Sequence, residues 1–104
     1  MAYVVSLSSR AQRDLDASYE DINAQHSDTA LKWYRGFWEV IVSLEEQPNR
    51  SPVTRGSAKY RHLLYGAKPH VYRAIFRVLE RQKRVEVLNI HFGARQDFKK
   101  SDLT

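Results

Sequence analysis

The sequence contains no cysteine, only three prolines and four glycines, and no long uninterrupted apolar run. The lack of cysteine excludes disulfide bonds, thiolate metal sites and a thiol nucleophile. The lack of a long apolar run argues against a membrane span, and the N-terminus has no basic segment followed by an apolar stretch, as a secretory signal would. We therefore expect a cytoplasmic protein with no membrane partner.

Motifs for common enzyme chemistry are missing as well. The four histidines are dispersed and show neither HxH nor HExxH spacing, so we expect no metal site. The sequence has no glycine-rich phosphate loop, no GxSxG elbow and no catalytic pair of carboxylates. No cofactor is predicted.

Positive charge is concentrated in one half of the chain. Residues 1–49 carry four Lys/Arg and eight Asp/Glu, whereas residues 50–104 carry thirteen Lys/Arg and four Asp/Glu, a net charge of +9. This asymmetry favours a polyanion or an acidic protein as the partner of the C-terminal half. A chain of 104 residues is short for two cores, so we expect one domain over residues 1–104.

The N-terminal half predicts a short strand and two helices. Residues 3–7 are rich in β-formers, and Ser9 and Gln12 have the spacing of a capping box. Apolar residues then recur at steps of three and four over 9–26 and again from Ser27-Asp28 to Gln47, where Pro48 ends the pattern. The short link between them predicts an antiparallel helical hairpin, with the tryptophans in its packing.

The C-terminal half predicts strands. After a polar loop at 48–59, residues 60–65, 71–79 and 85–92 alternate with a period of two and are separated by turns at 66–70 and 80–84. Short connections predict an antiparallel meander. The expected fold class is α+β: a strand, an antiparallel helical hairpin, then a three-stranded antiparallel meander.

A possible site follows from the alternation in these strands. Strand 71–79 puts its aromatic and small residues on one face and Arg73 and Arg77 on the other, so we expect that second face to be open in part. Together with Arg61, Asn89 and His91, these two arginines could form one patch. Such a patch would combine guanidinium groups that bind phosphate with an imidazole able to transfer protons near neutral pH. The alternative is that the arginines keep an exposed face soluble and that the histidine is structural.

The order and spacing of several segments resemble the RelE/ParE toxin superfamily over nearly the whole chain. They are Asp14-Leu15 in the first helix, Leu44 to Pro48, Tyr60 to Leu63, Val71 to Val78 and Val87 to Arg95. The resemblance implies the toxin of a type II toxin–antitoxin system of the plasmid-stabilisation kind. It also implies a cognate antitoxin as partner, with operator DNA bound only through that antitoxin.

The superfamily implies two different targets. ParE-like members act on DNA gyrase without known nuclease chemistry. RelE-like members look like ribosome-dependent ribonucleases that cut mRNA. The helical half and the segment from Ile90 to Arg95 look more ParE-like, so inhibition of gyrase is our preferred interpretation. The alternatives are a RelE-like mRNA endonuclease and a non-toxic basic module that binds nucleic acid or a regulator.

The RelE resemblance also implies roles for particular residues. Arg73 matches the arginine of a Tyr-Arg pair, Arg95 the arginine after the last strand and Arg61 a basic residue before the active face. In a nuclease they would hold the scissile phosphate and stabilise charge as the ribose 2′-hydroxyl attacks, and His91 or His62 would serve as acid or base. The chain departs from the pattern at Leu63, where RelE has lysine, and at Ser101, where a tyrosine is expected.

Overall fold

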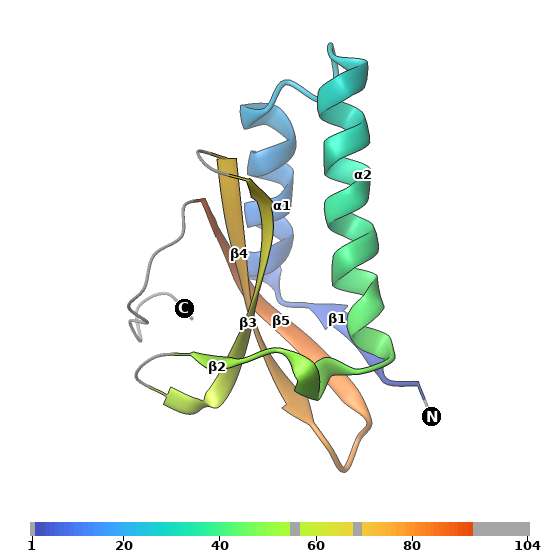
Figure 1. The fold of residues 1–104 in the computed structure, drawn as a ribbon, viewed down its shortest axis with the longest axis vertical. Coiled ribbons are helices and arrows are strands. Elements are labelled where there is room, and N and C mark those ends of the chain that lie inside the picture. Colours follow the sequence, from blue (N-terminus) through green and yellow to red (C-terminus); the bar gives the residue numbers. More distant parts are fainter. Residues whose placement is uncertain (1, 55–56, 68–69, 93–104) are drawn as a thin grey trace.

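In the described part of the chain, two helices cover one face of a five-stranded sheet (Figure 1). This computed structural model describes residues 2–54, 57–67 and 70–92. The α+β class and the order of strand, helical hairpin and antiparallel meander are confirmed. The elements in chain order are β1 (Val4–Leu7), α1 (Ser9–Asp21), α2 (Asp28–Val42), the 3₁₀ turns η1 (Ser43–Glu45) and η2 (Pro48–Arg50), β2 (Val53–Thr54), β3 (Ser57–Ala67), β4 (His70–Leu79) and β5 (Arg84–Phe92).

Both helices begin at a serine that caps the first turn. The Ser8 hydroxyl accepts a hydrogen bond from the N–H of Ala11 at 3.0 Å, and the Ser27 hydroxyl accepts one from Ala30 at 3.2 Å. The predicted capping box beginning at Ser9 is therefore wrong by one residue.

The first helix is shorter than the periodicity predicts. α1 ends at Asp21, whereas the apolar spacing extends to residue 26. Asn23 adopts a left-handed conformation with φ of 60°, which stops the helical ladder, and asparagine tolerates this conformation better than most residues. The remaining apolar residues therefore lie in the connection between the helices.

The strand order of the sheet is β1-β5-β4-β3-β2. β1 runs parallel to β5, and the other neighbouring pairs are antiparallel. The strand β2 was not predicted, because two residues are too few to show an alternating pattern. β2 itself and its pairing of Thr54 with Ser57 lie within the segment 48–59 that was expected to be a loop, whereas Val53 pairs with Arg61 beyond it.

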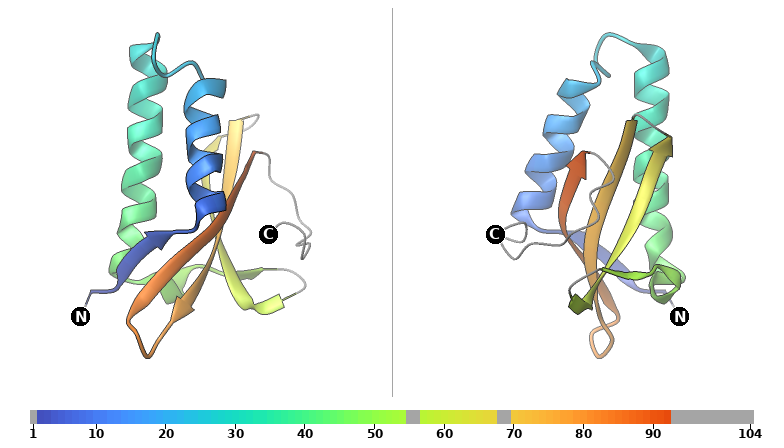
Figure 2. Two further views of the ribbon diagram at one scale, coloured as in Figure 1. Left: turned by 180° about the vertical axis from the view of Figure 1, so that it is seen from behind. Right: turned by 60° about the vertical axis from the view of Figure 1, so that its left-hand side comes forward.

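The helices pack side by side on one face, and none of the described helices lies on the opposite face of the sheet (Figure 2). The connection between α1 and α2 projects beyond the ends of β3 and β4 (Figure 1). Apolar side chains fill the space between the layers: Ala11, Leu15, Phe37, Ile41, Tyr72, Ala74, Phe76, Val85, Val87 and Ile90.

A glycine in α2 sets how closely β3 approaches this helix. The Tyr65 hydroxyl donates a hydrogen bond to the carbonyl of Trp33 at 3.1 Å, and a Cβ at Gly36 would overlap that hydroxyl. The Tyr65 ring stacks on Phe37, with an interplanar angle of 13°. The residue at position 36 therefore has to be small for this seam to form.

Within the residues that the structure describes, no helix is both long and apolar enough to span a bilayer.

Candidate functional site

The face without helices carries polar side chains from three neighbouring strands. His62 of β3 pairs in register with Ile75 of β4, which pairs with Asn89 of β5. Two residues away along β4, Arg73 pairs with His91. Because cross-strand partners share a face, His62, Arg73, Asn89 and His91 gather there and are called the sheet-face cluster below.

A bulge in β5 puts Asn89 on this face. Phe76 pairs with Val87 and the preceding Ile75 pairs with Asn89, so Leu88 is an extra residue in β5. Without it, the alternation of side chains would turn Asn89 toward the helices. The cluster therefore depends on this irregularity.

The first helix holds the bulge in place. The backbone N–H of Ser8 donates to the carbonyl of Val87 at 2.9 Å, and its hydroxyl donates to the carbonyl of Leu88 at 2.7 Å. The N–H of Ile90 donates to a carboxylate oxygen of Asp14 at 2.9 Å. Side chains of the helical layer thus satisfy backbone groups at the irregular part of the ladder.

Arg73 is almost completely buried, with 6% of its surface exposed. Its Nε has no hydrogen-bond partner, and none of the ion pairs among the described residues includes it. Burial lowers the pKa of its guanidinium, because the charged form is poorly solvated there. A buried cation without a counter-ion is unusual, and the surroundings of Arg73 are therefore of particular interest.

Two neighbours of Arg73 also carry unsatisfied polar atoms. Asn89 is 0% exposed, and neither its Oδ1 nor its Nδ2 has a partner in the described structure. The same holds for Nδ1 of His62. Burial and, to a smaller extent, the charge of Arg73 lower the pKa of His62, which favours the neutral form of its imidazole. Each unsatisfied polar group costs about 1–3 kcal/mol, which favours a role beyond folding.

The prediction that Arg61 lies beside Arg73 is wrong. Arg61 pairs in register with Phe76, which faces the helices, whereas Arg73 pairs with Leu64 on the other face. The Arg61 guanidinium donates to the carbonyl of Ser51 at 2.6 Å. The register of the β3–β4 hairpin decides these faces, and the residue types alone do not reveal it.

His62 takes the position on β3 that the sequence analysis gave to Arg61. The sequence offered this histidine only as one possible acid or base, with no signal that it faces Arg73. The structure does bring Asn89 and His91 to Arg73, as the predicted patch proposed.

Arg77 lies on the same face but already has an anionic partner. Its guanidinium binds the carboxylate of Glu86 at 2.7 and 2.8 Å, and 44% of its side chain is exposed. The pairing offsets much of its charge, so Arg77 adds little attraction for a polyanion.

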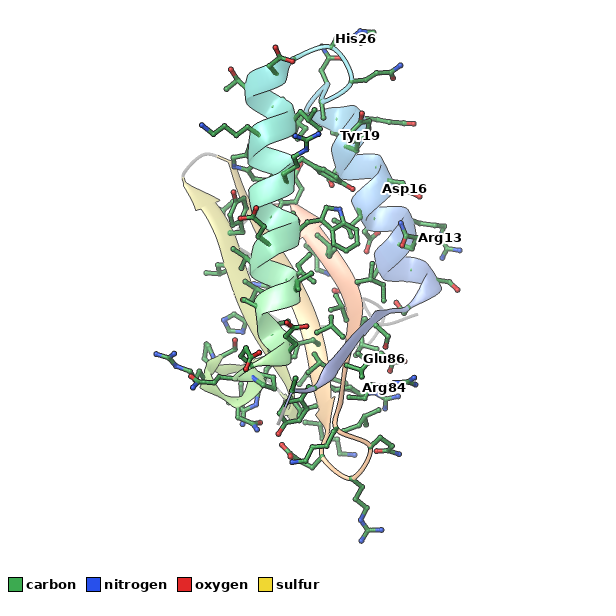
Figure 3. All side chains as sticks on the ribbon, turned by 90° about the vertical axis from the view of Figure 1, so that its right-hand side faces the viewer. Arg13, Asp16, Tyr19, His26, Arg84 and Glu86 are labelled. Atoms are coloured by element: carbon green, nitrogen blue, oxygen red, sulfur yellow. The ribbon has the colours of Figure 1, made fainter. Side chains whose placement is uncertain are left out.

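The remaining histidines and the other positions named from the resemblance lie elsewhere or outside the described residues. Arg95 and Ser101 fall in the segment 93–104, which the structure does not describe, and the His70 side chain is not described either. His26 lies at the far end of the helical hairpin, well away from Arg84 and Glu86 on β5 (Figure 3). Over residues 2–54, 57–67 and 70–92, no three acidic or histidine side chains gather as metal ligands would.

Comparison with known proteins gives one family match. The sequence profile described as "ParE toxin of type II toxin-antitoxin system, parDE" matches residues 5–97. No curated protein matches the chain.

Several solved structures share the fold at low sequence identity. The chromosomal ParDE toxin–antitoxin system of P. aeruginosa is 23% identical with a TM-score of 0.71, covering 89% of this chain and 98% of that chain. The RelBE2 toxin–antitoxin complex of Mycobacterium tuberculosis is 21% identical with a TM-score of 0.61, covering 93% and 95%. The E. coli RelBE complex is 17% identical with a TM-score of 0.61, covering 90% and 100%. At these identities the likeness concerns the fold.

Proposed function

Because the chain belongs to the ParE toxin family of type II toxin–antitoxin systems, we propose that it inhibits growth by acting on DNA gyrase through protein contacts. It would act in the cytoplasm and be neutralised by a cognate antitoxin, through which alone it would reach operator DNA. The basic C-terminal half and the toxin–antitoxin complexes among the similar structures support such a partner.

The placement of the arginines carries the choice of target. A ribonuclease site needs several donors that converge on one phosphate and on the charge that develops in the transition state. Arg61 and Arg73 instead lie on opposite faces of the sheet, and Arg77 is paired with Glu86. Leu63, where RelE has lysine, lies on the helix-side face and not beside Arg73. This arrangement supports a toxin that works by binding.

One observation favours a RelE-like mRNA endonuclease as the second candidate. Two histidines share a face with Arg73, and the neutral His62 could accept a proton. However, Arg61 lies on the opposite face and Arg77 is paired with Glu86, so neither can join Arg73 in holding a phosphodiester. The chain would be an enzyme only under this second candidate.

A direct test compares the two activities with the purified chain. We expect it to inhibit supercoiling by gyrase and to increase gyrase-linked DNA cleavage, while mRNA in a reconstituted translation system stays intact. Arg73→Ala should retain the inhibition of gyrase, because one buried arginine contributes little to a wide protein interface. Codon-positioned mRNA cleavage that Arg73→Ala abolishes would contradict the proposal and establish the endonuclease instead.

A further inference from the structure

The buried guanidinium of Arg73 has an unpaired Nε in the described structure. Among the described residues it is the single buried arginine, and the three ion pairs involve other groups. Moving a charge out of water is expensive unless a counter-ion or hydrogen bonds replace the lost solvation. The environment of Arg73 is therefore complementary to a negatively charged group that is not part of it.

Unpaired polar atoms from three strands share this face of the sheet. Arg73 contributes an Nε–H on β4 and Asn89 its amide N–H groups on β5, while His62 on β3 contributes Nδ1, which donates in one of the two neutral tautomers of imidazole and in the charged form; all three lack partners in the described structure. A carboxylate has two oxygens with about four acceptor positions and can satisfy several donors at once. We propose that the sheet-face cluster binds the carboxylate of an aspartate or glutamate side chain from a protein partner.

The surroundings favour a protein over a nucleic acid. Beside His62 is a hollow lined by the apolar Pro52, Leu63 and Leu64 together with Arg50 and Ser51, and Leu64 is 49% exposed. This mixed lining fits an acidic residue that has apolar neighbours. Nucleic acids are held by rows of exposed cations that follow the backbone.

The described arginines of β3 and β4 do not form such a row on this face. Arg77 is bound to Glu86, and Arg61 lies on the opposite face of the sheet. Of these three arginines, Arg73 is the one left on this face without an ion-pair partner among the described residues, a geometry suited to a single carboxylate.

Under the proposed function the antitoxin is the natural source of this residue. The inference rests on the family's having a protein partner and not on gyrase as target. A chain that failed to inhibit gyrase could still bind a carboxylate here, so the two proposals fail separately.

The test uses the full chain and a defined peptide probe. The acetylated, amidated tripeptide Leu-Glu-Leu is titrated into the protein while NMR follows the Arg73 Nε–H and the pKa of His62. Binding should shift the Nε–H signal and raise the pKa of His62, because a carboxylate offsets the charge of Arg73. The tripeptide Leu-Gln-Leu should bind at least about ten times more weakly, since a charge-assisted hydrogen bond is roughly twice as strong as a neutral one.

Matched variants locate the binding. Arg73→Met should abolish it, whereas Arg77→Met, on the same strand and face, should retain it. Asn89→Asp places a carboxylate inside the cluster and should also block the peptide, which keeps the test valid if Arg73→Met folds poorly.

Three results would overturn the inference. A single-stranded RNA 12-mer that shifts the Arg73 signal more strongly than the Glu peptide would make the site one for phosphate. Equal binding of the Glu and Gln peptides would remove the role of charge. No response to either peptide by a folded chain would mean that ordered water satisfies these groups.

Discussion

The two faces of the sheet differ in whether their buried polar groups have hydrogen-bond partners. On the helix-covered face, the Tyr65 hydroxyl has a partner in the Trp33 carbonyl, and the Tyr65 ring lies 4.9 and 5.2 Å from the rings of Trp33 and Phe37. On the uncovered face, buried atoms of His62, Arg73 and Asn89 have no partner in the described structure. The first face meets the requirements of folding, and the second departs from them as binding sites commonly do.

The largest expected effect comes from the helix-covered face. Phe76→Ala removes a fully buried ring between β4 and the helices, and we expect a loss of about 3–5 kcal/mol in the free energy of unfolding. Leu64→Ala on the uncovered face should change it by less than about 0.5 kcal/mol, because that side chain is half exposed. Urea denaturation measures both, and similar losses would contradict the proposed difference between the faces.

The bulge in β5 turns Asn89 to the uncovered face and is held by contacts from the helix side. Asp14 provides one of these contacts. Asp14→Ala leaves the N–H of Ile90 without its acceptor, and we expect a loss of about 2 kcal/mol together with faster hydrogen exchange at Ile90. Asp16→Ala is the control, because Asp16 lies on the outward side of the same helix (Figure 3). An equal effect of both substitutions would show that the helix matters and the bulge contact does not.

The sequence predicted the fold well but the candidate site only in part. Periodicity located both helices and the three long strands, because each buries one face and shows it as a repeat. The site depends on two features with no such signature: the register of the β3–β4 hairpin, which separates Arg61 from Arg73, and the extra residue Leu88. Each shifts side chains between faces without changing the composition of a strand.

The seam at Gly36 tests how tightly the helix-covered face is packed. Gly36→Ala should destabilise the protein by about 1 kcal/mol, since overlap with the Tyr65 hydroxyl outweighs the better helix propensity of alanine. In a Tyr65→Phe background the overlap is gone, and the same substitution should become neutral or stabilising. Thermal unfolding of the four chains gives the coupling; additive effects would mean that the helix and β3 shift apart easily.

The uncovered face should respond in the opposite direction. Arg73→Met replaces a buried, unpaired cation with an apolar side chain of similar length, and we expect a gain of about 1 kcal/mol in stability. Arg77→Met should give no gain, because Arg77 is exposed and paired with Glu86. Urea midpoints of the two variants decide this, and a strong loss for Arg73→Met would mean that its charge supports the fold.

The smallest effect is expected beyond both faces, at the turn between β4 and β5. Glu80 accepts hydrogen bonds from Asn49 and Tyr3, both at 2.8 Å, and these bonds, with Lys83 nearby, lower its pKa from the usual 4.5. A carboxylate whose pKa is lower in the folded state stabilises that state above pH 4.5, and this contribution is lost as the pH falls through the folded value.

Glu80→Gln should therefore lower the Tm at pH 6, and the difference from the parent protein should disappear as the pH falls below the folded pKa of Glu80. Because this turn contributes no residue to the sheet-face cluster, Glu80→Gln should leave the NMR signal of the Arg73 Nε–H unchanged at pH 6. If the substitution shifts that signal, the turn and the uncovered face respond as one unit. The two faces would then differ in how well their polar groups are solvated, and they would not respond independently to a change in the turn.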